Sequence, residues 1–578
     1  MDRLKHILFI ALAIGFQQIS FAQKTNSVIE LNEIDKTLNE SLYISTNANS
    51  YLTGETLFYK VFCIDKSTNK VSKHSKVAYL QLIDSNKKTI FTHKLFLEDG
   101  TANSDFFIPT TVETGNYKLI GYTNWMLNKK VAEFCTVDLY IVNPYKENKI
   151  NTIPQKELNL SKNITNENIA FDLKNKTYAN RDLIEFKINT YSDDFIKGNY
   201  SLSVKKEDGF LSQNKTSFKE LQINNLNKNS DSEIHQTDFI LPELRGEIIS
   251  GKISSTNAET KNKKIALSIV GKNYILKLAK TDSEGKFIFN LEKSNSGSNI
   301  IVQIIEDNKK DYTIEIDKPK EIDFSTLTFP ALQFNSAFRQ NISERVIASQ
   351  IENAYYNIKK DSVLASNDTI PFYGNLSKEY KLDAYTRFPT VEETITEVVY
   401  GTYFTKNKNN YAIHVYDYDP NYESELPALI VVDGLIIEDL NELFAYNSKN
   451  IYKINVVKGI YYYGAKSFNG VVVFTTKNGD YETKLKGSFI IRPELLRPQS
   501  KKEYFQPDYA NTKSARIPDY RHQLLWLPKV DLSNYDSKIK FYTSDVSGKF
   551  EIILEGFSAG GKPVFIKEII DIQDSGLN

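Results

Sequence analysis

The chain has 578 residues, which is too long for a single hydrophobic core, so we expect several domains. Its 72 basic and 72 acidic residues give a formal net charge of zero, which argues against a general binder of nucleic acids or anionic membranes. Tyrosine and phenylalanine are abundant, at 35 and 34 residues, and both favour β-strands. We therefore expect a multidomain protein that is mainly β.

Residues 1–22 have the pattern of a secretory signal peptide. The basic residues Arg3 and Lys5 precede an apolar run at 7–16 that is too short to span a bilayer. Small side chains before the expected cut predict cleavage after Ala22; an uncleaved anchor is the alternative. No later segment approaches the ~18 apolar residues that a spanning helix needs. The pattern predicts an exported protein.

Residues 23–145 alternate strand and turn signals in the manner of a β-sandwich. The segments "SLYISTNANSYLTGETLFYKVFCID" and "GNYKLIGYTNW" resemble the MG2 domain of the macroglobulin family. A second unit at 160–230 repeats the polar entry, the alternating strand and the Gly-Asn-Tyr step, and resembles a second macroglobulin-like domain. Cys63 and Cys135 both lie in the first unit. The sequence allows two alternatives: the two cysteines form a disulfide, or both are buried free thiols.

Residues 242–322 form a third predicted β unit, marked by "LRGEIISGKISS" and "KTDSEGKFIFNL". This unit resembles the regulatory β domain that is attached to carboxypeptidases and to many outer-membrane receptors, and the resemblance implies no catalytic residues. A helical segment is predicted within 335–370. Its apolar positions recur at helical spacing: Ile342, Val346, Ile347, Ile351, Tyr355 and Ile358. We expect this stripe to pack on a neighbouring domain, with a partner-binding helix as the alternative.

Residues 385–480 carry the most informative pattern in the chain. Thr390 and Glu393 form a capping box that predicts a helix start, and several strands follow. Five short motifs then occur in order: Val432-Asp433-Gly434, Val457-Lys458-Gly459, Tyr463-Gly464, Asn469-Gly470-Val471 and Thr475-Thr476-Lys477. Together they resemble the plug domain of TonB-dependent outer-membrane receptors, especially the SusC-type nutrient transporters. The receptors continue into a barrel of about 22 strands. The segment after Gly479 is too short for one and lacks its regular alternation.

The remaining chain is predicted to be a linker at 481–515 and a C-terminal β domain at 516–574. The C-terminal part contains "LLWLP" and two Gly-rich turns, and it resembles a late macroglobulin domain. The complete order of units resembles a group of envelope proteins of Bacteroidota.

The sequence contains few candidates for chemistry. Neither cysteine lies in the Cys-Gly-Glu-Gln thioester of protease-trapping macroglobulins. Gly556–Gly560 matches the Gly-x-Ser-x-Gly nucleophile motif around Ser558, but a strand follows where the motif needs a helix, so we expect a hairpin tip. An acidic loop is a weak calcium candidate and more simply a solvated loop: Asp417, Asp419, Glu423 and Glu425. Tyr461–Tyr463 is either a contact patch or core. We expect no catalytic, metal-binding or cofactor-binding residues, no cofactor, and no enzymatic activity.

These patterns predict a periplasmic protein associated with the outer membrane. Its plug-like domain would dock on, or seal, a barrel supplied by another chain, either a transporter or a protein translocon. Further envelope proteins are additional candidate partners, and nucleic acid is not. The alternative is a macroglobulin-like protease inhibitor or surface-protein chaperone, with 481–515 as an exposed bait segment.

Overall fold

The protein is described here from a computed structural model. The described residues are 38–146, 152–153, 162–207, 240–329, 334–335, 339–364, 371–408, 410–416, 426–464, 466–510, 517–533 and 538–574. The predicted signal peptide and the acidic loop at 417–425 lie outside these residues. The fold is mainly β, with 46% strand and 10% helix, which confirms the predicted fold class. Among the described residues, no helix combines the length and the apolar character needed to cross a membrane.

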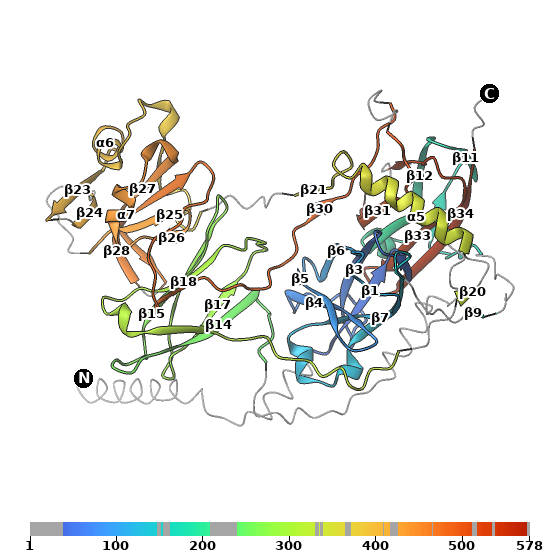
Figure 1. Ribbon diagram of the computed structural model, residues 1–578, viewed down its shortest axis with the longest axis horizontal. Coiled ribbons are helices and arrows are strands. Elements are labelled where there is room, and N and C mark those ends of the chain that lie inside the picture. Colours follow the sequence, from blue (N-terminus) through green and yellow to red (C-terminus); the bar gives the residue numbers. More distant parts are fainter. Residues whose placement is uncertain are drawn as a thin grey trace, which may run out of the picture.

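The described chain forms two lobes, which Figure 1 shows side by side. The first lobe contains two β-sandwiches and the long helix. Two sheets, with strand orders β1-β3-β6 and β2-β8-β7-β4-β5, build its first sandwich. The strands are β1 (Glu40–Thr46), β2 (Ser50–Leu52), β3 (Thr56–Asp65), β4 (Val77–Asp84), β5 (Thr89–Phe96), β6 (Thr101–Phe107), β7 (Gly115–Tyr122) and β8 (Cys135–Val142). Strand β3 alternates as its sequence predicts, because Leu57, Tyr59 and Val61 all enter the core between the two sheets.

The second sandwich combines two segments that are far apart in the sequence. Its early elements are β10 (Ile169–Asp172), β11 (Thr177–Ala179), β12 (Leu183–Thr190), α3 (Asp193–Ile196) and β13 (Asn199–Lys206). Its late elements are β31 (Gln523–Val530), β32 (Ile539–Tyr542), β33 (Gly548–Phe557) and β34 (Pro563–Gln573). Strand β13 lies between β33 and β31, and both segments fill one core. The separate domains that we expected at 160–230 and 516–574 are therefore one domain, because each half lacks the strands that would complete its sheets.

The second lobe also joins two predicted units. The first, hereafter the 246–316 unit, contributes β14 (Glu247–Ser254), β15 (Lys264–Ile269), β16 (Ile275–Lys280), β17 (Lys286–Leu291), β18 (Ile300–Ile304) and β19 (Thr313–Ile316). The second contributes β22 (Lys378–Lys381), α6 (Val391–Glu397), β23 (Thr402–Asn407), β24 (Asn410–Val415), β25 (Leu429–Val432), β26 (Leu435–Ile436), α7 (Leu440–Phe444), β27 (Ile451–Tyr463) and β28 (Lys466–Thr476). A single hydrophobic cluster runs through both units.

Two local features of the second lobe occur at the positions that the sequence predicts. The capping box of Thr390 and Glu393 is present at the start of α6. Asp433 and Gly434 form the turn between β25 and β26, with φ angles of 48° and 92°. The predicted linker at 481–515 begins later than expected, because Tyr481, Phe489 and Ile490 belong to the core of this lobe. Strand β29 (Ile490–Ile491) pairs with β18 and ties the segment to the sheet.

Helix α5 (Arg339–Ala354) lies against the first lobe, and it is shorter than the predicted segment 335–370. The predicted apolar stripe is not the most buried side, because Ile347 is 55% exposed and Ile358 lies beyond the end of the helix. The most buried positions are Arg345, Ala348 and Ser349, at 4%, 5% and 8% exposure. Short ladders complete the fold: β9 (Thr152–Ile153) with β20 (Phe334–Asn335), and β21 (Ser362–Val363) with β30 (Lys502–Glu503).

Candidate functional site

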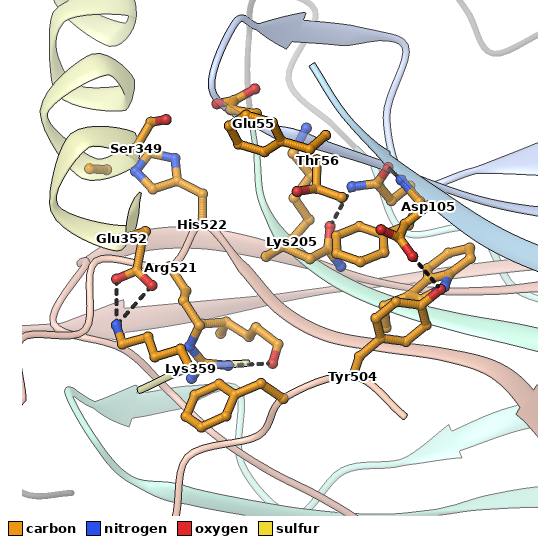
Figure 2. Close-up of a pocket in the computed structure, with 18 of the residues that line it drawn as sticks. Glu55, Thr56, Asp105, Lys205, Ser349, Glu352, Lys359, Tyr504, Arg521 and His522 are labelled. Carbon is orange, nitrogen blue, oxygen red and sulfur yellow. Dashed lines mark hydrogen bonds and ion pairs between the residues drawn. The ribbon is translucent and has the colours of Figure 1, made fainter. Parts of the chain in front are cut away.

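A pocket of about 770 Å³ lies between the two sandwiches of the first lobe and helix α5 (Figure 2). Strands β3 and β6 supply one wall, β13 and β31 supply another, and α5 closes a third side. The segment around β30, which returns from the second lobe, completes the lining. This volume falls in the range of ligand-binding pockets in proteins.

The polar side of α5 explains how the helix closes the pocket. Arg345 donates through Nε and Nη2 to the carboxylate of Glu55, at 2.9 and 2.6 Å. Ser349 donates to the Gly54 carbonyl at 2.9 Å, and Asn353 donates to the same oxygen at 3.1 Å. Gly54 has a φ of +91°, and a Cβ there would lie 2.8 Å from Ser349 Oγ. The turn before β3 therefore needs glycine both for its backbone and for the close approach of α5.

Electrostatic pairing holds most charges of the pocket in place. Burial acts to raise the pKa of Glu55, but Arg345 beside it outweighs this effect and holds that pKa below its usual value. Lys359 donates to both oxygens of Glu352 at 2.8 Å. Lys502 donates to both oxygens of Asp105 at 2.9 Å. These three acid–base pairs are therefore already satisfied within the protein.

A partly buried aromatic floor lies next to these ion pairs. Phe58 contacts Tyr504 edge-on, with ring centroids 5.0 Å apart, and lies 6.0 Å from the Trp526 ring. Trp526 Nε1 is buried and has no hydrogen-bond partner among the described residues. Burial lowers the pKa of His522 to about 3, so this imidazole is neutral at physiological pH. Neutral rings beside satisfied charges favour binding of an organic group over acid–base chemistry.

The residues that the sequence singled out lie outside this pocket. Ser558 lies at the turn of the antiparallel β33–β34 hairpin, where it is 2% exposed and donates to Asp194 Oδ2 at 2.9 Å. Cys63 is buried, and neither it nor Cys135 forms a disulfide. Within the described ranges, no cluster of three or more His, Cys, Asp or Glu residues is arranged to hold a metal ion.

The three consecutive tyrosines, Tyr461–Tyr463, were predicted to be either a contact patch or core, and the structure shows some of each. Tyr461 and Tyr463 pack on Phe372, with ring centroids 6.1 and 4.6 Å apart. Tyr462 between them is 75% exposed. This alternation is typical of a strand with one covered face.

Sequence reasoning missed the pocket, because its lining comes from distant parts of the chain. One local signal was present: Arg345, Ser349 and Glu352 recur at helical spacing and mark a polar stripe. A polar stripe on a surface helix normally faces water. Only the Glu55 carboxylate and the Gly54 carbonyl opposite it show that this one is buried.

No family model matches the chain, and no curated protein matches it. Several solved structures are similar to it at low identity. Trypsin-activated α2-macroglobulin from Escherichia coli is 8% identical, with 94% of this chain and 24% of that chain covered and a TM-score of 0.16. The same protein activated by porcine elastase is 8% identical, with 93% and 44% covered and a TM-score of 0.23. A β-glucosidase from Listeria innocua is 14% identical over 18% of this chain and 16% of that chain, with a TM-score of 0.12.

The chain spans less than half the length of the α2-macroglobulin chains to which it is similar. At these TM-scores the similarity supports no statement about function.

Proposed function

We propose that this chain is an exported, non-enzymatic binding protein of the periplasm whose plug-like unit, predicted at 385–480, docks on an outer-membrane barrel supplied by another chain. The barrel is a transporter or a protein translocon. The observation that carries the proposal is that the plug-like motifs, separated in sequence, come together in one folded unit of the second lobe. A wide barrel leaks unless its lumen is filled, so a plug-like unit has a physical task on the barrel of another chain.

The plug-like motifs serve packing inside the lobe. Gly434 has a φ of +92°, and a Cβ there would lie 2.4 Å from the Cβ of Tyr274 in the 246–316 unit. The Val-Asp-Gly turn is therefore built for close contact with that unit. Asp433 is fully buried and accepts hydrogen bonds from Thr476 Oγ1, Thr476 N and Tyr481 N. The regulatory-like β unit thus packs directly on the plug-like unit.

The first lobe fits the role of a spacer in this proposal. Its sandwiches have separate cores, and its contact with the second lobe includes buried charged side chains. Glu247 accepts from Lys94 at 2.9 Å and from Arg497 at 2.6 Å, and these three buried residues join the lobes. Such a contact fixes the direction in which the second lobe is presented.

The test is affinity purification of the tagged full chain from detergent-solubilised envelopes, followed by mass spectrometry. We expect one outer-membrane barrel protein at near-stoichiometric yield, and recovery of this chain when that barrel is tagged instead. An exported protein with the same tag serves as the control. Repeated purification with no barrel protein above the control would contradict the proposal.

A second function is favoured by the pocket in the first lobe. A macroglobulin-like inhibitor or chaperone needs a contact point for a client, and the pocket has aromatic rings and the volume to take one side chain of a client. The predicted bait at 481–515 is poorly suited to it, because β30 pairs with β21 and Arg497 is 7% exposed. Incubation with a panel of proteases tests this function: capture or inhibition supports it, and rapid cleavage without inhibition argues against it.

A further inference from the structure

The plug-like unit presents one covered face and one exposed face. The covered face packs on the 246–316 unit, where Leu276, Val457 and Phe468 share a cluster. The opposite side carries large side chains that remain exposed. Tyr400 and Tyr462 are each 75% exposed, and Tyr416 is 53% exposed. Isolated exposed tyrosines are common, so what matters is whether they are neighbours.

Contacts join Tyr416 to Tyr400, and the regular alternation of β27 places Ile460 and Tyr462 on the side away from Tyr461 and Tyr463. Tyr416 N donates to the Gly401 carbonyl at 2.9 Å, which places Tyr416 beside Tyr400. The ring of Tyr403 lies 4.9 Å from the ring of Tyr416 and connects it to the β23–β24 hairpin. One aliphatic side chain extends the surface: Ile460 on β27, two positions after Lys458, at 44% exposure.

Two lysines give this surface its charge. Lys378 Nζ lies 5.3 Å from the centroid of the Tyr400 ring, and Lys458 Nζ lies 5.4 Å from the same centroid. Among the residues that the structure describes, neither ammonium group has a carboxylate partner, unlike the paired lysines of the pocket. Two cations held over an exposed ring attract anions, and the ring offers apolar contact at the same point.

We infer that the surface formed by Tyr400, Tyr416, Tyr462, Lys378 and Lys458, hereafter the tyrosine face, is the docking site for a protein whose matching surface sets carboxylates among apolar side chains. This inference rests on the proposed function, because it names the face with which the plug-like unit meets its partner. Tyrosine is enriched at the centres of protein interfaces, where it supplies area and a polar tip together.

The size of the surface fits the centre of an interface rather than a complete one. A buried aromatic side chain contributes roughly 150–250 Å², so the exposed tyrosines supply on the order of half of the ~800 Å² that each partner of a stable complex buries. The aliphatic rim and neighbouring polar groups supply the remainder.

The charge is too small for a membrane surface. A lysine near an anionic bilayer contributes about 1 kcal/mol, and basic segments that bind membranes carry about 4–8 cations. Two lysines would hold the protein at a bilayer only weakly. Against a protein carboxylate that is partly shielded from water, the same two cations are more effective.

Site-specific photocrosslinking in cells tests the inference on the full chain. A photoreactive phenylalanine analogue replaces Tyr400 or Tyr462 in separate variants, and a third variant carries it at Tyr191, which is 66% exposed in the first lobe. We expect one discrete crosslinked protein from positions 400 and 462 and none from 191. The crosslinked peptide of the partner should contain Asp or Glu.

Charge reversal makes the test specific. The double substitution Lys378→Glu with Lys458→Glu should reduce the crosslink at least tenfold, and arginine at both positions should retain it within twofold. Lys310→Glu, at an exposed site of the other unit in this lobe, is the matched control and should leave the crosslink unchanged. Circular dichroism melting verifies that each variant stays folded.

The outcomes separate the inference from the proposed function. A crosslink to lipid, or to protein with no effect of charge reversal, would overturn the inference. Co-purification of a barrel protein without any crosslink at 400 or 462 would also overturn the inference while the proposed function stands. A charge-sensitive crosslink to an acidic protein that is not a barrel would support the tyrosine face and reject the barrel.

Discussion

The two lobes join their parts by different physical means. In the first lobe, separate cores meet at a joint that combines polar contacts with a small apolar cluster: Ser45 donates to Glu555 at 2.7 Å, and Phe62 packs on Phe557 with ring centroids 5.4 Å apart. In the second lobe, two units of different sequence character share one apolar core. Apolar burial is non-directional and insensitive to pH, whereas buried polar contacts depend on geometry and on protonation. The first lobe should therefore separate at its joints before its cores melt, and the second should unfold as one body.

The largest expected effect comes from a cavity in the shared core. Phe474 on β28 is fully buried, so Phe474→Ala should cost about 3–5 kcal/mol. Because the core is continuous, hydrogen exchange should accelerate in β15 and β18 as well as in β27 and β28. Ile288→Ala, at a position 46% exposed in the same lobe, is the control and should change stability little. Full protection of β15 and β18 in the Phe474 variant would mean that the two units fold independently.

Breaking the ion pair beneath α5 should come next in magnitude. Arg345 and Glu55 side chains are 4% and 20% exposed, and removing one partner of a buried pair costs about 3 kcal/mol or more. Arg345→Ala should therefore release α5 and raise its proteolysis while the two sandwich cores stay folded.

Two further variants sharpen the Arg345 prediction. The exposed Gln340→Ala change on the same helix is the control. Adding Glu55→Gln to Arg345→Ala should recover part of the loss, because it removes the unpaired carboxylate. An unchanged proteolysis rate at α5 in Arg345→Ala would refute a role for this pair in holding the helix.

A pH dependence is expected at the joint between the sandwiches. Lys60 is 2% exposed, donates to Asn199 Oδ1 and to the Tyr200 carbonyl, and burial lowers its pKa to about 7. A lysine in the unfolded chain has a pKa of about 10.4, so the unfolded state binds the proton more tightly. Stability should therefore rise with pH between about 7 and 10, by at most about 1.4 kcal/mol per pH unit, and level off at its lowest value below 7, where both states hold the proton.

Denaturant unfolding across this pH range measures the Lys60 effect, and Lys60→Met should flatten it. A slope that persists in the methionine variant would assign the dependence to another group.

The contact between the lobes should show a smaller dependence of opposite sign. Glu243 is 2% exposed, accepts from Tyr79 at 3.1 Å and from Ile248 N at 3.0 Å, and burial raises its pKa to about 7. Its unfolded pKa is about 4.3, so its contribution is complete below that value and is lost as pH rises through about 7. Glu243→Gln should remove this loss, which small-angle scattering can follow as the separation of the lobes between pH 5 and 8. Identical scattering across that range in the unaltered protein would contradict the prediction.

The amino-acid sequence alone determined much of the local structure. The Thr390–Glu393 capping box and the position of the Asp433-Gly434 turn can be recognised from short local motifs, and both occur as predicted. The alternation in β3 likewise reports which side chains face a core. The mainly β composition follows from the strand-forming residues, and the structure confirms it.

Tertiary structure decided which strands and surfaces meet. The sequence of β13 does not reveal that its partners are β31 and β33, more than 300 positions away, because backbone hydrogen bonds carry no residue identity. The buried side of α5 was likewise settled by Glu55 and Gly54 opposite it, against the apolar pattern of the helix itself. The periodicity of a helix or strand shows that it has a distinct face. Whether that face is buried depends on the groups of other elements that pack against it.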